Sequence, residues 1–251
     1  MKTLFFYPLL ILLAFTGIKQ GKTSVSEEIE KANNAGKAVF MVVTDPAVVN
    51  TTNALNTAQQ AKKLHPKSAV IKMNRSDAVN KELVAKYRLA GAPLPLILVI
   101  ASNGVVTGGY QVNQATADNL VALIPSPKKA EVLLTLNQRK SAFIVVSKKS
   151  MLKKKEVVSK CQLACAEMNN RAKVIEIDLD DTKEKSFLSE LKVNQLATQP
   201  QTYVINANGQ MTGTLSGVVD TKTLIATATK AAGGGCCPKG SKKSCGPTKN
   251  K

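Results

Sequence analysis

Continuous apolar stretches alternate with amphipathic stretches in the first half of the chain. Residues 38–43 are apolar throughout, which is typical of a strand buried in a parallel sheet. Residues 51–64 and 80–89 both place apolar side chains at helical spacing, and a second strand is predicted between them over 69–74. The pattern therefore predicts a strand, a helix, a strand and a helix in that order.

A proline and a turn pair indicate how this half ends. Pro95 opens a strand that runs to Asn103-Gly104, and an Asn-Gly pair is the strongest short-range sequence signal for a β-hairpin. Residues 105–110 should therefore return antiparallel, and residues 117–124 close the unit as a helix. The complete predicted order is β-α-β-α-β-β-α.

The second half repeats the first about 104 residues later. Three blocks recur in one order: 38–43 as 142–147, 70–74 as 174–178, and 95–104 as 200–209. In the third block the proline, a Val-Ile pair and the Asn-Gly pair keep their register. We therefore predict two copies of one fold, over residues 25–125 and 128–232, with a boundary near Ser126-Pro127-Lys128.

This order of elements, with a proline entering the third strand and Asn-Gly between strands three and four, resembles the thioredoxin fold. The resemblance implies two tandem α/β thioredoxin-like domains, each with a mixed four-stranded sheet and flanking helices. In that family the proline is cis and lies beside the active site, and Pro95 and Pro200 are the matching residues here. The alternatives are an ordinary trans proline at the start of the strand in either copy, and Pro93 in place of Pro95.

The cysteines that carry the chemistry of the thioredoxin family are missing from both copies. The family's Cys-x-x-Cys lies where the first strand meets the first helix, whose N-terminus lowers the pKa of the attacking thiol. Residues 43–48 and 146–151 occupy those places and contain no cysteine. The chain thus resembles the non-catalytic thioredoxin-like domains that occur in tandem in disulfide isomerases. We expect no thioredoxin-type enzyme activity, and a polypeptide partner held beside Pro95 and Pro200 or between the domains.

Two cysteines fall inside the first helix of the second copy. Cys161 and Cys165 belong to an apolar stripe made by Val157, Val158, Cys161, Ala164, Cys165 and Met168. Their i, i+4 spacing places both thiols on one face, where they could hold one soft metal ion together. A stripe that packs on a sheet favours buried core residues instead, and the helical span is near the upper limit for a disulfide.

The other three cysteines lie in a segment without apolar periodicity. Residues 233–251 begin with three glycines and are rich in lysine, which predicts a flexible tail. Neighbouring ammonium groups favour the thiolate forms of Cys236, Cys237 and Cys245. These thiols could form a loop disulfide, cross-link to a partner, or bind Cu(I) or Zn(II), although their spacing matches no strong metal signature. The second hypothesis for function is therefore a redox-active or metal-handling thiol protein that acts through this tail.

The first residues have the pattern of an export signal. Lys2 precedes an apolar run from Leu4 to Ile18, which suits a signal peptide and is shorter than the roughly 20 residues of a spanning helix. Residues 1–21 are predicted to be a signal peptide or, because the cleavage site is poorly defined, a retained membrane anchor. Either alternative predicts an exported protein that is periplasmic, secreted or anchored in the cell envelope.

The charge of the chain is strongly positive and is carried mainly by lysine. The formal net charge is +18, and only 4 of the 35 basic residues are arginine. A protein that reads nucleic acid is expected to use more arginine and more aromatic side chains, and this chain has no tryptophan. We therefore expect no specific nucleic-acid partner. Weak contact with anionic envelope polymers or lipid head groups requires only point charges and remains a hypothesis.

Overall fold

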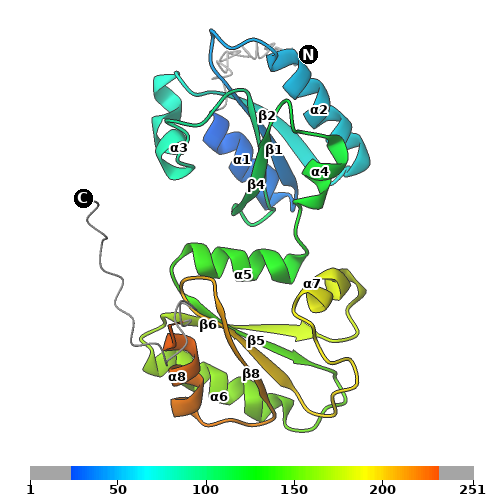
Figure 1. Ribbon diagram of the computed structural model, residues 1–251, viewed down its shortest axis with the longest axis vertical. Helices are drawn as coiled ribbons and strands as arrows, with labels where there is room; N and C mark the ends of the chain where they lie inside the picture. The colour runs from blue at the N-terminus through cyan, green and yellow to red at the C-terminus, as the bar shows by residue number, and fades with distance from the viewer. Residues whose placement is uncertain (1–23, 232–251) are drawn as a thin grey trace, which may run out of the picture.

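The chain forms two α/β units that follow one another along the sequence (Figure 1). The structure is a computed structural model, and it describes residues 24–231; residues 1–23 and 232–251 lie outside the described part. The elements of the first unit are α1 (Val25–Asn34), β1 (Ala38–Thr44), α2 (Thr51–Leu64), β2 (Ser68–Asn74), the 3-10 helix η1 (Ala78–Asn80), α3 (Lys81–Lys86), β3 (Leu96–Ile100), β4 (Val106–Gln111) and α4 (Ala117–Ala122).

The second unit repeats this series of elements. They are α5 (Pro127–Asn137), β5 (Ser141–Ser147), α6 (Lys154–Glu167), β6 (Ala172–Asp178), the 3-10 helix η2 (Thr182–Glu184), α7 (Lys185–Glu190), β7 (Gln201–Ile205), β8 (Met211–Ser216) and α8 (Thr221–Thr229). The predicted boundary near Ser126-Pro127-Lys128 coincides with the N-terminus of α5, whose N-cap is Ser126.

Each unit contains one mixed four-stranded sheet. The strand orders are β2-β1-β3-β4 and β6-β5-β7-β8. The first two strands of each unit pair in parallel, and the third pairs antiparallel with both the first and the fourth. This topology confirms the predicted fold, two tandem thioredoxin-like domains.

The central strand of each sheet is buried on both faces, which explains its continuous apolar sequence. In the first domain, Val39, Met41 and Val43 of β1 pack on the side of α1 and α3. Phe40 and Val42 point the other way and pack on the side of α2 and α4. The second domain has the same layers, with α5 and α7 on one face and α6 and α8 on the other.

Each domain begins with a helix that the hydrophobic pattern did not predict. The start of α1 is marked by a capping box, in which the Ser24 hydroxyl accepts from the Glu27 amide and the Glu27 carboxylate accepts from the Ser24 amide. At the start of α5, Ser126 is the N-cap and Pro127 lies in the first turn. Both helices therefore had start signals in the sequence.

The strand pairing corrects the predicted alignment of the two copies by one residue. Phe40 of β1 pairs with Val70 and Val99, and Phe143 of β5 holds the same place in the second sheet. Ala142 is therefore the counterpart of Val39, whereas the sequence comparison had set it against Ala38. A shift of one residue moves every side chain of a strand to the opposite face.

Helix α5 lies between the two sheets and contacts both domains (Figure 1). Its Ala130 packs against Ala101 and Val105 of the β3–β4 hairpin in the first domain. The side-chain amide of Asn103, from the predicted Asn-Gly turn, donates to the Ala130 carbonyl at 2.7 Å. Val132, on another face of α5, belongs to the core of the second domain. The first domain therefore contacts the second through a helix that is apolar on two sides.

A buried carboxylate holds the N-terminus of α5. Glu184, at the end of η2, is 1% exposed. It accepts a hydrogen bond from the Ser126 hydroxyl at 2.6 Å and from the Lys128 amide at 2.9 Å. Because a helix N-terminus has unpaired amides and a partial positive charge, this carboxylate caps α5 at the start of the second domain.

Among residues 24–231, no helix is both long and apolar enough to cross a bilayer. The predicted signal peptide or anchor, residues 1–21, lies outside the described residues.

Candidate functional site

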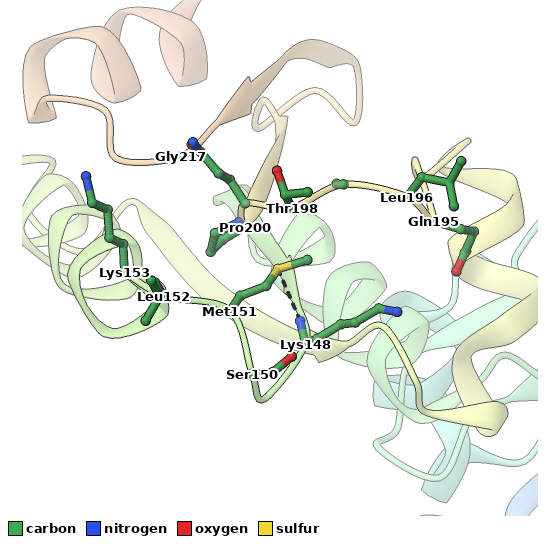
Figure 2. Close-up of a pocket in the computed structure, with 12 residues that line it drawn as sticks. Lys148, Ser150, Met151, Leu152, Lys153, Gln195, Leu196, Thr198, Pro200 and Gly217 are labelled. Atoms are coloured by element: carbon green, nitrogen blue, oxygen red, sulfur yellow. Dashed lines mark hydrogen bonds between the residues drawn. The ribbon is translucent and has the colours of Figure 1, made fainter.

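The position of the thioredoxin active site is occupied in the second domain by a groove between two loops (Figure 2). One loop, residues 148–153, joins the end of β5 to α6, and the other, residues 195–200, leads into β7. The cavity between them has a volume of about 600 Å³, and Gly217 completes its lining. The fold thus brings Pro200 next to the loop that carries cysteines in catalytic members of the family.

The two prolines enter the sheet in the same way but with different peptide bonds. The Leu94–Pro95 bond is cis, as the resemblance implied. The Gln199–Pro200 bond is not cis, so the prediction of a cis bond at Pro200 is wrong. Trans is the intrinsically favoured isomer of an X–Pro bond. The carbonyl of Pro200 accepts from Gly217 at 2.8 Å, as that of Pro95 accepts from Val112 at 3.2 Å, so the strand begins alike in both domains.

Two leucines of the groove are almost fully exposed. Leu152 is 85% exposed and lies at the α6 side, whereas Leu196 is 88% exposed and lies at the opposite side (Figure 2). Met151 and Pro200 lie between them in this view, and the Lys148 amide donates to the Met151 sulfur at 3.4 Å. Single exposed leucines are common on protein surfaces, but two that flank one cavity form an unpartnered apolar site.

Asn194 holds the loop that carries Leu196 by hydrogen bonds. Its side-chain oxygen accepts from the Leu196 amide at 3.0 Å, and its carbonyl accepts from the Ala197 amide at 3.2 Å. The same carbonyl accepts from the Gln201 side chain at 3.0 Å, and Gln201 in turn accepts from the Tyr203 hydroxyl at 2.8 Å. These hydrogen bonds connect the loop of residues 195–200 to the first residues of β7, so the sheet holds this side of the groove in position.

Glycine is favoured at position 217, directly after β8. Gly217 has φ +68°, which lies in the left-handed region that favours glycine. A Cβ atom at this position would also collide with the side-chain oxygen of Gln199, the residue before Pro200. The close approach of this backbone to Gln199 therefore shapes the floor of the groove.

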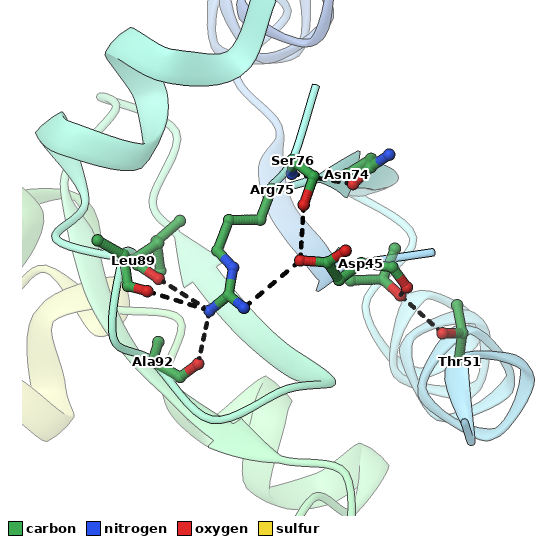
Figure 3. Close-up of polar contacts among 9 residues, drawn as sticks. Asp45, Thr51, Asn74, Arg75, Ser76, Leu89 and Ala92 are labelled. Atoms are coloured by element: carbon green, nitrogen blue, oxygen red, sulfur yellow. Dashed lines mark hydrogen bonds and ion pairs between the residues drawn. The ribbon is translucent and has the colours of Figure 1, made fainter. Parts of the chain in front are cut away.

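In the first domain, the equivalent loops are bonded to one another through Arg75 (Figure 3). One guanidinium nitrogen donates to the carbonyls of Leu89, Ala90 and Ala92, at 3.3, 3.4 and 2.9 Å. The other lies 3.5 Å from the carboxylate of Asp45, in the loop after β1. Arg75 thus links that loop to the segment that precedes Pro95. Its counterpart after β6 is the apolar Leu179, which joins the core of the second domain.

The hydroxyl of Ser76 also donates to Asp45, at 2.7 Å. Thr44, at the end of β1, shares a 2.7 Å hydrogen bond with Thr51, the first residue of α2. The loop between Thr44 and Thr51 is therefore held by hydrogen bonds at both of its ends.

The two cysteines of α6 are core residues. Cys161 and Cys165 are 1% and 8% exposed, are not bonded to each other, and pack with Val157, Val158, Ala164 and Met168 as the apolar stripe predicted. Burial raises the pKa of each thiol to about 11, and a hydrogen bond with Thr202 partly offsets this for Cys161. Thiols in this state are poor nucleophiles and poor metal ligands at neutral pH.

Within residues 24–231, no three His, Cys, Asp or Glu side chains come together as a metal site. Cys236, Cys237 and Cys245 lie outside the described residues.

The groove lies beside Pro200, one of the two positions at which the sequence predicts a binding surface, but the sequence pattern did not identify the side chains that line it. Leu152 had a weak signal, because it is an apolar residue in a loop that is rich in lysine. Leu196 had none, since a lone leucine in a polar loop is ordinary. Asn194 and Gly217 become interpretable only once the loop before β7 and the end of β8 are seen together.

No protein-family model matches this sequence, and comparison with curated proteins also finds no match. The first two thioredoxin domains of Saccharomyces cerevisiae Eps1p are similar in structure, with 8% identity over 82% of this chain and 96% of that chain and a TM-score of 0.31. The zinc-bound form of human ERp44 has 11% identity over 81% of this chain and 56% of that one, with a TM-score of 0.36. The NTD_N/C domain of the alkylhydroperoxide reductase AhpF from Enterococcus faecalis has 13% identity over 81% and 99%, with a TM-score of 0.27. The fold assignment accordingly rests on the strand order and connections of the two sheets.

Proposed function

We propose that this protein binds a polypeptide partner in the groove beside Pro200 and does not itself catalyse thiol–disulfide exchange. The observation that carries the proposal is the pair of exposed leucines, Leu152 and Leu196, on the two sides of a cavity of about 600 Å³. Full burial of one leucine side chain contributes about 1.5–3 kcal/mol, so two apolar anchors contribute about 3–6 kcal/mol before the costs of association. Because association itself costs about 4–15 kcal/mol, the two leucines position a bound segment, and other contacts in the groove supply the rest of the affinity.

The second domain is favoured over the first as the main binding site. Beside Pro95, Arg75 bonds to the segment that would have to admit a partner, and Asp45 holds Arg75 in place. Beside Pro200, the corresponding loops are separated by the groove. The surface at Pro95 is accordingly a secondary contact in this proposal.

The chemistry of the described cysteines supports a role without catalysis. Thiol exchange requires an accessible thiolate. Cys161 and Cys165 are buried, and their pKa values are raised to about 11. Neither the loop after β1 nor the loop after β5 contains a cysteine.

Export to the cell envelope or the secretory space is part of the proposal and is supported by the apolar run in residues 1–21. The lysine-rich composition supports an additional weak contact with anionic envelope polymers or lipids.

The test uses a defined unfolded polypeptide, fluorescein-labelled α-lactalbumin that has been reduced and carboxymethylated. Binding to the full chain is measured by fluorescence anisotropy. We expect the double variant Leu152→Ser/Leu196→Ser to lower the affinity at least about tenfold, since it removes both apolar anchors. Leu163→Ser is the matched control, because Leu163 is 51% exposed on α6 and does not line the groove. Equal binding by all three proteins would disprove the proposal.

A further inference from the structure

The groove in the second domain is basic as well as apolar. Lys148 and Lys153 belong to its lining, and none of the lining residues is acidic. Three more lysines lie on the same loop and in the first turn of α6: Lys149, Lys154 and Lys155. Lys153 and the lysines of the first turn of α6 thus place positive charge at the α6 side of the groove, near Leu152, whereas Lys148 extends towards the side of Gln195 (Figure 2).

Nearby carboxylates neutralise only part of this charge. Asp180 lies 3.6 Å from the ammonium group of Lys148, and Glu176 lies 3.5 Å from that of Lys154. Glu156, in the first turn of α6, is the other acid on this helix end. Lys153 makes no ion pair with any residue in the described part of the chain. Residues 148–156 carry five lysines against one acid, so the field of this segment is positive.

The backbone adds to this field. Helix α6 has 14 residues, and its N-cap Lys153 makes no side-chain hydrogen bond to the first turn. The unpaired amides at a helix N-terminus carry a partial positive charge. The equivalent loop of the first domain, residues 45–50, has Asp45 and no lysine. The basic character is thus specific to the groove in the second domain and is not simply a consequence of the overall charge.

We propose that the groove selects a polypeptide segment that is acidic as well as apolar, an inference that rests on the function proposed above. Leu152 and Leu196 take the apolar side chains of the segment, and Lys148 and Lys153 meet its carboxylates. A cavity that lies between two loops can accommodate a single extended peptide, whereas a flat lipid surface could not enter it. Charge complementarity of this kind sets specificity more than it sets total affinity.

The experiment compares three labelled peptides that share the same leucine positions and differ only in their polar residues. These residues are Asp and Glu in the first peptide, Asn and Gln in the second, and Lys in the third. We expect the acidic peptide to bind the full chain about tenfold more tightly than the neutral one at low salt, and the basic peptide to bind weakest. The advantage of the acidic peptide should shrink as salt is added.

Two charge variants of equal size locate the effect. Lys148→Gln/Lys153→Gln should abolish the preference for the acidic peptide. Lys62→Gln/Lys63→Gln removes the same charge from exposed lysines in the last turn of α2 and should preserve that preference. Loss of the preference in both variants would assign it to the overall charge and overturn the inference.

The outcomes separate this inference from the proposed function. If the acidic and neutral peptides bind equally and the variant Leu152→Ser/Leu196→Ser binds neither, the charge preference is wrong and the polypeptide groove stands. If no peptide binds, both proposals are overturned. Vesicles of phosphatidylserine and of phosphatidylcholine form a further arm, and binding to the anionic vesicles without binding to any peptide would assign the surface to lipid and overturn the inference.

Discussion

Replacing Glu184 should weaken the second domain at its boundary with the first. Its carboxylate is 1% exposed and accepts from the Ser126 hydroxyl at 2.6 Å and from the Lys128 amide at 2.9 Å. Glu184→Ala removes the cap of α5, which costs about 0.5–2 kcal/mol, and leaves two part-buried donors, the Ser126 hydroxyl and the Lys128 amide, without this partner, which costs up to about 1–3 kcal/mol. Because these two costs overlap, we expect the free energy of unfolding to fall by about 2–4 kcal/mol.

Two measurements on the full chain test this prediction. The free energy of unfolding is obtained from urea denaturation followed by far-UV circular dichroism, since the chain has no tryptophan for fluorescence. Limited digestion with trypsin reports on the boundary itself, because Lys128 and Lys129 lie in the first turn of α5. Loosening this turn should make cleavage after these lysines faster in Glu184→Ala than in the wild-type protein.

Two further variants separate the cap from other effects. Glu184→Gln keeps the shape and one acceptor, so it should cost only about 1 kcal/mol. Glu30→Ala removes the same negative charge from an exposed position on α1 and should change stability by less than about 0.5 kcal/mol. The capping argument would be refuted if Glu184→Ala had the same urea midpoint as the wild-type protein. It would also be refuted if Glu30→Ala lost as much stability as Glu184→Ala.

Arg75→Ala should destabilise the first domain by about 2–4 kcal/mol in urea denaturation, because three carbonyls lose a charged donor. Arg75→Lys should restore only part of this stability, since an ammonium group cannot reproduce the planar guanidinium. Wild-type stability in Arg75→Lys would show that the planar guanidinium group is not needed at this position. The raised pKa values of Cys161 and Cys165, about 11 in the folded protein against about 9 unfolded, favour the neutral thiol, so their stabilising effect is fully present below pH 9 and is lost as pH rises towards 11. Between pH 8 and 10, the wild-type protein should therefore lose up to about 1 kcal/mol more per thiol than Cys161→Ala/Cys165→Ala, and parallel pH profiles in urea denaturation would contradict this. The full chain should not reduce insulin disulfides, whereas turnover abolished by Cys161→Ser or Cys165→Ser would show that the active site was misplaced. A chain ending at Gly235 should keep its melting temperature, and it should lose Cu(I) or Zn(II) binding if the tail cysteines bind metal. Equal metal uptake by the full chain and by the truncated chain would exclude the tail as the metal site.

The fold was predictable because its strongest signals are local. A strand buried on both faces must be apolar throughout, and the Asn-Gly pairs specify the hairpins within a few residues. The alignment of β1 with β5 was wrong by one residue for the same reason, since a strand that is apolar on both faces gives no alternation from which to read the register. The pairing of β1 with β2 and β3, and of β5 with β6 and β7, supplied the register by placing Phe40 and Phe143 at the same point of the two sheets.

The sequence by itself determined the fold, its duplication and the absence of cysteines from the loops after β1 and β5. A binding site beside Pro95 and Pro200 is still a prediction. Only the tertiary structure decided that the loops beside Pro95 differ from those beside Pro200. Arg75 bonds to backbone carbonyls that follow it by more than a dozen residues, and Leu152 and Leu196 lie on opposite sides of one cavity. Contacts between residues far apart in the chain depend on how loops pack at the end of a sheet, and hydrophobic periodicity describes only neighbours along one helix or strand.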